Sequence, residues 1–212
     1  MKVGTDGVLL GAWASIPPSM APHPTVLDVG TGTGLVALMM AQRYTNACVT
    51  GIDIDNGAVC QAAKNVSSSP FADRISIVRK AVQEYEGAFD AVVSNPPFFD
   101  KSLKTPNTLR NMARHTDTLT YAELMHAAHR LLKDDGELSV VVPFDYRKRM
   151  EDEATFMGFF PSRVLAVRTT PNQSARRFLL AFKKHSCERS FEVMTVGDEN
   201  YCRMMADFYL NY

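Results

Sequence analysis

The sequence predicts an α/β fold in which helices cover both faces of a mostly parallel sheet. Short apolar runs alternate with amphipathic segments of helix length between residues 25 and 142, as in repeated strand–helix units. The apolar runs are nearly continuous, which is typical of strands buried on both faces. A glycine-rich turn joins the first of these strands to the next helix. At 212 residues, the chain is expected to form one domain over residues 1–212.

Five parallel strands can be assigned before residue 143. They are expected at residues 25–29, 48–54, 74–78, 89–94 and 137–142. Helical spacing of apolar residues predicts helices at 34–44, 57–66 and 120–132. Thr120 and Glu123 form a capping-box pattern at the start of the third helix, and the Asp-Asp-Gly at residues 134–136 predicts a turn.

The segment after Pro143 is expected to add an antiparallel edge to the sheet. The expected elements are a charged helix at about 145–157, strands at 162–170 and 176–184, a turn at 171–174 and a helix at about 200–210. The two strands would pair with each other in the antiparallel sense, which predicts a seven-stranded sheet in total.

Composition and charge limit the class of protein and its compartment. The chain has no net charge at pH 7, and no apolar run approaches the roughly 20 residues of a membrane-spanning helix. Residues 143–189 contain twice as many basic as acidic residues, which leaves nucleic-acid contact and an ordinary solvated face equally open. The four cysteines lack metal-ligand spacing and indicate free thiols. With no signal-peptide pattern at the N-terminus, a cytoplasmic protein without a metal or membrane partner is expected.

Glycines dominate the turn after the first strand. In VLDVGTGTGL, Gly30, Gly32 and Gly34 precede a helix, where glycine lets the backbone approach a ligand closely. The spacing differs from the dinucleotide-binding Gly-x-Gly-x-x-Gly, because Leu35 stands at the third glycine position. Asp28 precedes the glycines, and its carboxylate suits a cationic ammonium or sulfonium ligand better than a pyrophosphate.

The second strand ends in the acidic sequence GIDID. Asp53 lies where a carboxylate can accept hydrogen bonds from two ribose hydroxyls, and Ile54 can pack on an adenine. The alternative is a turn or helix-capping role for Asp53, although Asp55 already offers a capping residue nearby.

The fourth strand ends in VVSNPPFF, before a long polar loop at residues 95–118. Pro96 and Pro97 cannot donate hydrogen bonds to a sheet. One interpretation is a rigid turn that places two phenylalanines in the core. The other is a pocket for a planar amine, with Asn95 as hydrogen-bond acceptor and Phe98 as stacking surface.

These three motifs, in this order, resemble the class I S-adenosylmethionine-dependent methyltransferases that modify amino groups. In addition, MKVGTDGVLLGAWA, RNMARHTDTL, ARRFLLAF and the terminal FYL are similar to the bacterial tRNA1(Val) adenine-N6 methyltransferase family. The resemblance covers essentially the whole chain, which is expected to be N-terminally short relative to that family. It implies a Rossmann-like fold, S-adenosylmethionine as cofactor, tRNA as partner, and N6-methylation of the adenine on the 3′ side of the anticodon.

The resemblance also implies a role for each motif. The implied cofactor-binding residues are Asp28, Gly30, Gly32, Gly34, Asp53, Ile54 and Ala81. The implied catalytic residues are Asn95, Pro96, Pro97 and Phe98. The implied substrate-binding residues are Lys2, Phe99, Arg110, Arg114, Arg176 and Arg177.

One position departs from the pattern of the family. Many relatives have an acid after the third strand that accepts hydrogen bonds from the cofactor adenine, whereas this chain has VRKAVQEY. A charged Lys80 cannot accept a hydrogen bond. The adenine is therefore expected to be read by backbone atoms, by Gln83 or by Glu84.

The opening segment permits two interpretations. In one, Lys2, Thr5 and Asp6 close over the cofactor and target site. In the other, Thr5 or Asp6 caps a helix that contributes apolar side chains to the core, namely Val8, Leu9 and Trp13.

The motifs also leave room for other substrates and for other classes of protein. Asn-Pro-Pro-Phe also occurs in methyltransferases acting on guanine N2 of ribosomal RNA, and a similar motif occurs in those acting on a glutamine amide. A nicotinamide-dependent oxidoreductase is disfavoured by the glycine spacing. A binding module without activity is disfavoured by the intact Asn95–Phe98 motif.

Overall fold

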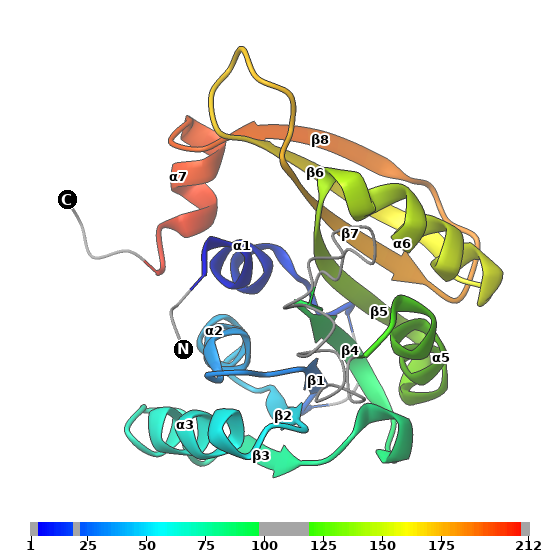
Figure 1. The fold of residues 1–212 in the computed structure, drawn as a ribbon. Coiled ribbons are helices and arrows are strands. Elements are labelled where there is room, and N and C mark those ends of the chain that lie inside the picture. Colours follow the sequence, from blue (N-terminus) through cyan, green and yellow to red (C-terminus); the bar gives the residue numbers. More distant parts are fainter. Residues whose placement is uncertain (1–3, 19–21, 98–118, 209–212) are drawn as a thin grey trace, which may run out of the picture.

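The computed structural model describes residues 4–18, 22–97 and 119–208, and it contains one eight-stranded sheet. The strand order is β3-β2-β1-β4-β5-β7-β6-β8 (Figure 1). The first five strands in sequence pair in parallel, as the apolar runs predict. They are β1 (Thr25–Val29), β2 (Cys48–Asp53), β3 (Ile75–Arg79), β4 (Phe89–Ser94) and β5 (Leu132–Pro143).

The other three strands form the opposite side of the sheet. β7 (Arg177–Lys183) lies antiparallel between β5 and β6 (Phe160–Arg168), as expected. β8 (Ser190–Thr195) then pairs in parallel with β6. The predicted count of seven strands is therefore wrong by one. β8 could not be predicted from the sequence because it lacks a continuous apolar run, as expected for a strand whose first four residues are exposed. Its pairing with β6 holds it in place.

A bulge replaces the turn predicted before the fifth strand. β5 begins directly after the preceding helix, and Leu132 already pairs with Phe89. The register then shifts until Glu137 pairs with Ala91. A Cβ atom on Gly136 would lie 2.7 Å from the Leu132 side chain and 2.9 Å from the Asp90 carbonyl oxygen, so the bulge requires glycine.

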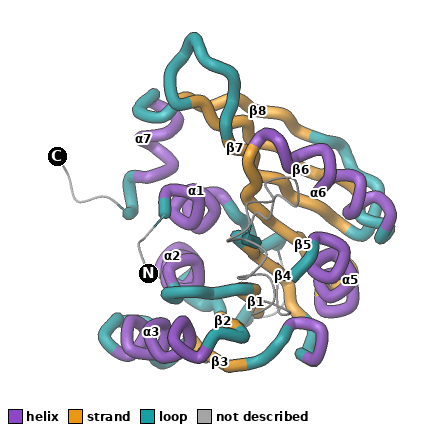
Figure 2. Tube along the Cα trace, in the orientation of Figure 1, coloured by secondary structure: helices purple, strands orange, loops and turns teal. Residues whose placement is uncertain are grey.

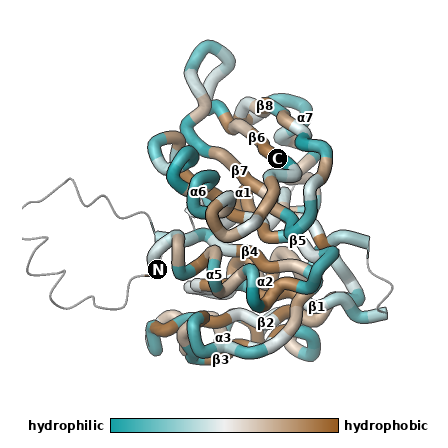
Figure 3. The backbone as a smooth tube through the Cα atoms, turned by 90° about the vertical axis from the view of Figure 1, so that its right-hand side faces the viewer, coloured by the Kyte–Doolittle hydropathy of each residue, from teal (hydrophilic) through white to brown (hydrophobic). Residues whose placement is uncertain are grey.

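Helices cover both faces of the sheet, and each face has its own apolar core (Figures 1 and 2). Figure 3 colours the strands mostly brown and the exposed helix α6 largely teal. One face carries α1 (Thr5–Trp13), α2 (Leu35–Arg43), α3 (Asn56–Ser67) and α7 (Glu199–Met205). The other carries the short helix η1 (Val82–Glu84), α5 (Tyr121–Leu131) and α6 (Phe144–Phe156).

The two predicted helix caps have different outcomes. Thr120 caps α5, and its capping box with Glu123 is confirmed. The residue that precedes α1 is Gly4, without a side-chain cap, so a capping role for Thr5 or Asp6 is wrong. Leu9 is buried in α1, with Val8 and Trp13 packed against the same core. No helix in the described ranges is long and apolar enough to cross a bilayer.

Candidate functional site

Three glycines shape the turn between β1 and α2. Gly30, Gly32 and Gly34 have φ values of 71°, 56° and 80°, a region that side-chain-bearing residues rarely adopt. At Gly34 an added Cβ would also lie 3.3 Å from the Cβ of Ala62 in α3. Positive φ at all three positions therefore explains why the turn is built from glycine.

Hydrogen bonds attach this turn to the end of β2. The amides of Gly30 and Thr31 both donate to the Ile52 carbonyl at 2.9 Å. The Gly32 amide donates to Asp53 Oδ2 at 2.9 Å, and the Asp55 amide donates to Asp53 Oδ1 at 2.9 Å. Each carboxylate oxygen has two acceptor sites, so Asp53 keeps capacity for two further donors such as ribose hydroxyls.

Asp28 is buried beneath the turn. Its Oδ2 accepts hydrogen bonds from Thr31 Oγ1 at 2.7 Å and from the Ala37 amide at 3.2 Å. Burial raises the pKa of Asp28 to about 7, the charge of Asp53 adds to the rise, and the two hydrogen bonds oppose it. These contacts give Asp28 a role in fixing the glycine turn to the start of α2.

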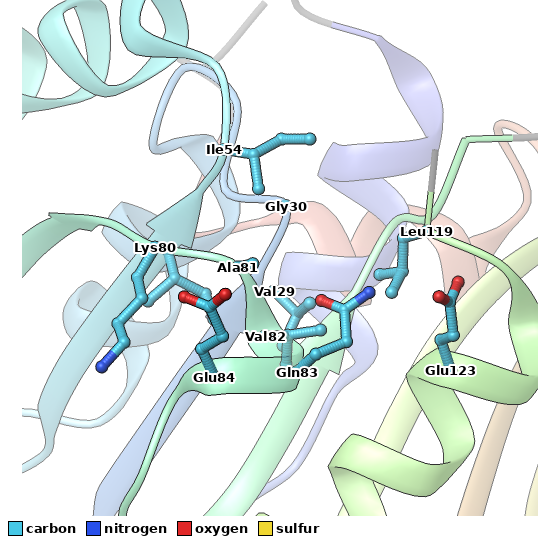
Figure 4. A pocket seen from close by; sticks show the side chains of 11 residues that line it. Val29, Gly30, Ile54, Lys80, Ala81, Val82, Gln83, Glu84, Leu119 and Glu123 are labelled. Atoms are coloured by element: carbon cyan, nitrogen blue, oxygen red, sulfur yellow. The ribbon is translucent and has the colours of Figure 1, made fainter. Parts of the chain in front are cut away.

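A cavity of about 290 Å³ opens beside the turn, at the carboxyl ends of β1 and β2 (Figure 4). The cavity brings together Gly30, Ile54 and Ala81 from the predicted cofactor site, and Ile54 is 42% exposed there. Gly32 and Asp53 are not among its lining residues, although Ile52 and Ile54 on either side of Asp53 are. The remaining lining residues are Val29, Ile52, Lys80, Val82, Gln83, Glu84, Leu119 and Glu123.

The positive charge of Lys80 lies away from the cavity. Its Nζ is 5.9 Å from the centre of the Tyr85 ring, and its side chain runs away from the other lining side chains in Figure 4. The Lys80 amide donates to the Asp53 carbonyl at 3.1 Å. Polar groups at this end of the cavity therefore come from Gln83, Glu84 and the backbone of η1.

Arg130 and Glu123 of α5 support η1, and sequence reasoning missed both contacts. Arg130 donates to the carbonyls of Tyr85, Val82 and Gln83 at 2.6, 3.1 and 3.2 Å. The hydrogen bonds from Thr120 lower the pKa of Glu123, with a further contribution from the Gln83 side chain. The capping-box pattern identified Glu123 only as a structural residue, and no local pattern marks Arg130, because its partners lie more than 40 positions away.

The Asn-Pro-Pro motif starts where β4 ends, directly beside the glycine turn. Ser94 pairs with Val29 in the sheet, and its Oγ donates to the Val29 carbonyl at 2.9 Å. Asn95 is half-buried, Pro96 is buried and Pro97 is exposed. Asn95 follows Ser94 and Gly30 follows Val29, so the Asn-Pro-Pro motif and the glycine turn both start at this hydrogen-bonded pair.

The predicted substrate-binding residues lie in different places. Arg177 Nε donates to both carboxylate oxygens of Asp6 at 2.8 and 2.9 Å, which ties β7 to the first turn of α1. Arg176 and Arg177 both line a hollow next to Phe144, separate from the cofactor cavity. Five of the predicted site residues lie outside the described residues, namely Lys2, Phe98, Phe99, Arg110 and Arg114. Within the described ranges no cluster of His, Cys, Asp or Glu could hold a metal ion.

Comparison with known proteins places the chain in a family. The model of the methyltransferase small domain matches residues 15–157. A protein of Bacteroides fragilis is 42% identical to this chain, and the alignment covers 99% of this chain and 91% of the relative. A protein of Phocaeicola vulgatus is 43% identical, with 100% of this chain and 92% of the relative covered. A protein of Trichodesmium erythraeum is 37% identical, with 100% of this chain and 92% of the relative covered. All three are named tRNA1(Val) (adenine(37)-N6)-methyltransferase.

Solved structures agree on the fold. A predicted O-methyltransferase from Agrobacterium tumefaciens aligns with a TM-score of 0.69 at 18% identity, covering 92% of this chain and 90% of the other. A glycopeptide N-methyltransferase in complex with S-adenosylmethionine aligns with a TM-score of 0.62 at 11% identity, covering 86% and 94%. The chain belongs to the methyltransferase small domain family and, within it, to the family of the tRNA1(Val) (adenine(37)-N6)-methyltransferases.

Proposed function

We propose that this protein transfers the methyl group of S-adenosylmethionine to N6 of adenine 37 in tRNA1(Val), the reaction named for its relatives. The observation that carries the proposal is the Ser94–Val29 hydrogen bond. It joins the strand end that presents Asn95-Pro96-Pro97 to the strand end that presents the glycine turn. A target amine held by the first is thereby next to a cofactor held by the second.

The residues around the cavity fit S-adenosylmethionine. Ile54, Ala81 and Val82 offer apolar surface for the two faces of an adenine. Asp53, between the lining residues Ile52 and Ile54, has acceptor capacity for the ribose, and the glycines leave space beside the backbone for the methionine part. When bound, this cofactor supplies an electrophilic methyl group on a positively charged sulfur.

Asn95 and Pro96 would hold the target amine. The Asn95 side-chain oxygen and the Pro96 carbonyl can accept the two N–H bonds of adenine N6, which directs the nitrogen lone pair away from the ring. Because Pro96 and Pro97 have no N–H, the backbone here offers acceptors without competing donors. Phe98 would stack on the base, a contact worth roughly 1–3 kcal/mol in comparable sites.

This arrangement requires positioning rather than a strong base. The amine becomes acidic once it has gained the methyl group, so its proton can pass to solvent. The contribution of Asn95 and Pro96 is therefore to fix geometry and to place dipoles where the charge changes. Arg176, which lines the hollow at the end of β5, would contact phosphates together with other basic residues of segment 143–189.

The experiment that tests this proposal uses labelled S-adenosylmethionine and total RNA from a strain that lacks this gene. We expect the label to appear as N6-methyladenosine in tRNA. A tRNA1(Val) transcript with guanine in place of adenine 37 should then accept no label. Label in guanosine of ribosomal RNA, or in protein only, would overturn the proposed substrate.

A further inference from the structure

A second hollow lies outside the proposed cofactor site. It has a volume of about 480 Å³ and is formed where β5 ends and β7 begins. Pro143, Phe144 and Asp145 line one side, and residues 173–177 line the other. It shares no lining residue with the cofactor cavity, so the proposed cofactor site does not account for it.

The sheet register places this hollow at the same edge of the sheet as the Asn-Pro-Pro motif. Ser94 at the end of β4 pairs with Val140 of β5, so the chain leaves β5 beside the segment that follows β4. Phe144 is four residues beyond Val140, and Asn95 is one residue beyond Ser94. At about 3.3 Å per extended residue, the two side chains originate roughly 10 Å apart along the strand direction.

Phe144 is exposed and yet held in a fixed position. Its side chain is 58% exposed, which is costly for an aromatic ring that has no partner. Its amide donates to the Arg176 carbonyl at 3.1 Å, and its ring lies 6.1 Å from that of Phe178. Arg147 packs on the other ring, 4.5 Å from the centre of Phe178. The exposed ring therefore rests on a support that is already ordered.

Two charged side chains in the hollow have unused hydrogen-bonding capacity. In the described part of the chain, neither the Asp145 carboxylate nor the Arg176 guanidinium has a hydrogen-bond or ion-pair partner. Both line the hollow together with Phe144. An aromatic face, a carboxylate acceptor and a guanidinium are the groups that bind an unstacked base, its amino group and its phosphate.

We propose that this hollow binds the nucleotide next to the methylated adenine. Its base stacks on Phe144, Asp145 accepts a hydrogen bond from its amino group, and Arg176 holds its phosphate. This inference rests on the proposed function, because it takes the target to be an adenine in a single-stranded loop. It adds a residue, Phe144, that selects RNA without touching the reacting atoms.

The test is a double-mutant cycle between Phe144 and the RNA. Full-length tRNA1(Val) is assembled by ligation with an abasic residue on the 5′ or the 3′ side of adenine 37. The Kd of each RNA is measured by fluorescence anisotropy for wild type, Phe144→Ala, Phe144→Trp and Phe156→Ala. Phe156 is the matched control, since it is an 86% exposed phenylalanine at the other end of the same helix.

We expect Phe144→Ala to weaken binding of intact tRNA about tenfold, with Phe144→Trp and Phe156→Ala close to wild type. One of the two abasic RNAs should bind the wild-type protein about tenfold more weakly than intact tRNA does. The same abasic RNA should bind Phe144→Ala as tightly as intact tRNA binds that variant. Unchanged affinity for S-adenosylmethionine would show that the variant is folded.

Equal behaviour of Phe144→Ala and Phe156→Ala, or additive losses with both abasic RNAs, would overturn the inference. So would wild-type protein that does not bind the tRNA. The cycle needs no methyl transfer, so the two proposals can fail separately. Coupling to Phe144 without any methylation of adenine 37 would overturn the proposed function and leave the nucleotide-binding hollow in place.

Discussion

Ser94 Oγ donates a buried hydrogen bond of 2.9 Å to the carbonyl of Val29. Val29 is the last residue of β1 and Ser94 the last of β4, so this bond fixes the starting points of the glycine turn and of the Asn-Pro-Pro motif. In a parallel sheet both strand ends point to the same edge, where ligands of such folds bind. One hydrogen bond thus sets the relative position of the two halves of the proposed site.

Replacing Ser94 should affect both stability and transfer. Ser94→Ala leaves the Val29 carbonyl without this partner, and we expect the free energy of unfolding to fall by about 1–3 kcal/mol. Ser139→Ala is the matched control, because Ser139 is a buried serine whose hydroxyl has no partner among the described residues. Measured by urea denaturation and by kcat, Ser94→Ala should lose more stability and more activity than Ser139→Ala. Equal losses of both quantities in the two variants would contradict a special role for the Ser94 hydrogen bond.

Asp53 and Asp55 should have separable functions although they are two residues apart. Asp53→Ala removes the acceptor for the Gly32 amide and the proposed acceptor for the ribose, so the Kd for S-adenosylmethionine should rise at least about tenfold. Asp55 instead caps α3, accepting from the Ala58 amide at 2.6 Å. Asp55→Ala should cost about 1 kcal/mol of stability with little change in cofactor affinity. Calorimetric titration in which Asp53→Ala binds like wild type would contradict the ribose role.

Arg130 should influence cofactor affinity without touching the cofactor. Arg130→Met removes the donors to three carbonyls of the η1 turn but keeps the apolar stem. We expect the Kd for S-adenosylmethionine to rise about tenfold while the kcat at saturation is retained. Arg203→Met is the control, since the one ion-pair partner of Arg203 among the described residues is the exposed Glu199. A Kd unchanged in Arg130→Met would show that η1 holds its shape unaided.

Asp28 should make stability depend on pH. Burial raises its pKa to about 7, above the ordinary value of 3.8, so between these values the folded state binds more protons than the unfolded state. The contribution of this group to stability therefore falls as pH rises from about 4 to about 7. Asp28→Asn should lack that decline and keep an acceptor for Thr31. If the unfolding free energies of wild type and Asp28→Asn changed with pH in parallel, the raised pKa of Asp28 would be refuted.

Much of this architecture could be predicted from the sequence because its signals are local. Apolar runs gave the five parallel strands, glycine spacing gave the turn, and Thr120 with Glu123 gave the start of α5. What could not be predicted depends on partners distant in sequence. β8 is held by its pairing with β6, and the bulge at Gly136 by contact with the neighbouring strand.

The candidate site divides in the same way. Gly30, Ile54 and Ala81 could be placed at one cavity because each immediately follows or lies close to a strand end. The burial of Asp28, the Asp6–Arg177 pair and the bonds of Arg130 could not, because local patterns do not specify which side chains meet across layers.

The central claim is that Asn95 holds the amine that receives the methyl group. The most direct measurement is the single-turnover rate of methyl transfer to tRNA1(Val) by Asn95→Ala, alongside its Kd for S-adenosylmethionine. We expect the Kd to stay within about twofold of wild type and the rate to fall by roughly 100-fold or more, as for other lost dipoles at a reacting centre. A variant that binds the cofactor and transfers methyl groups at the wild-type rate would contradict the account.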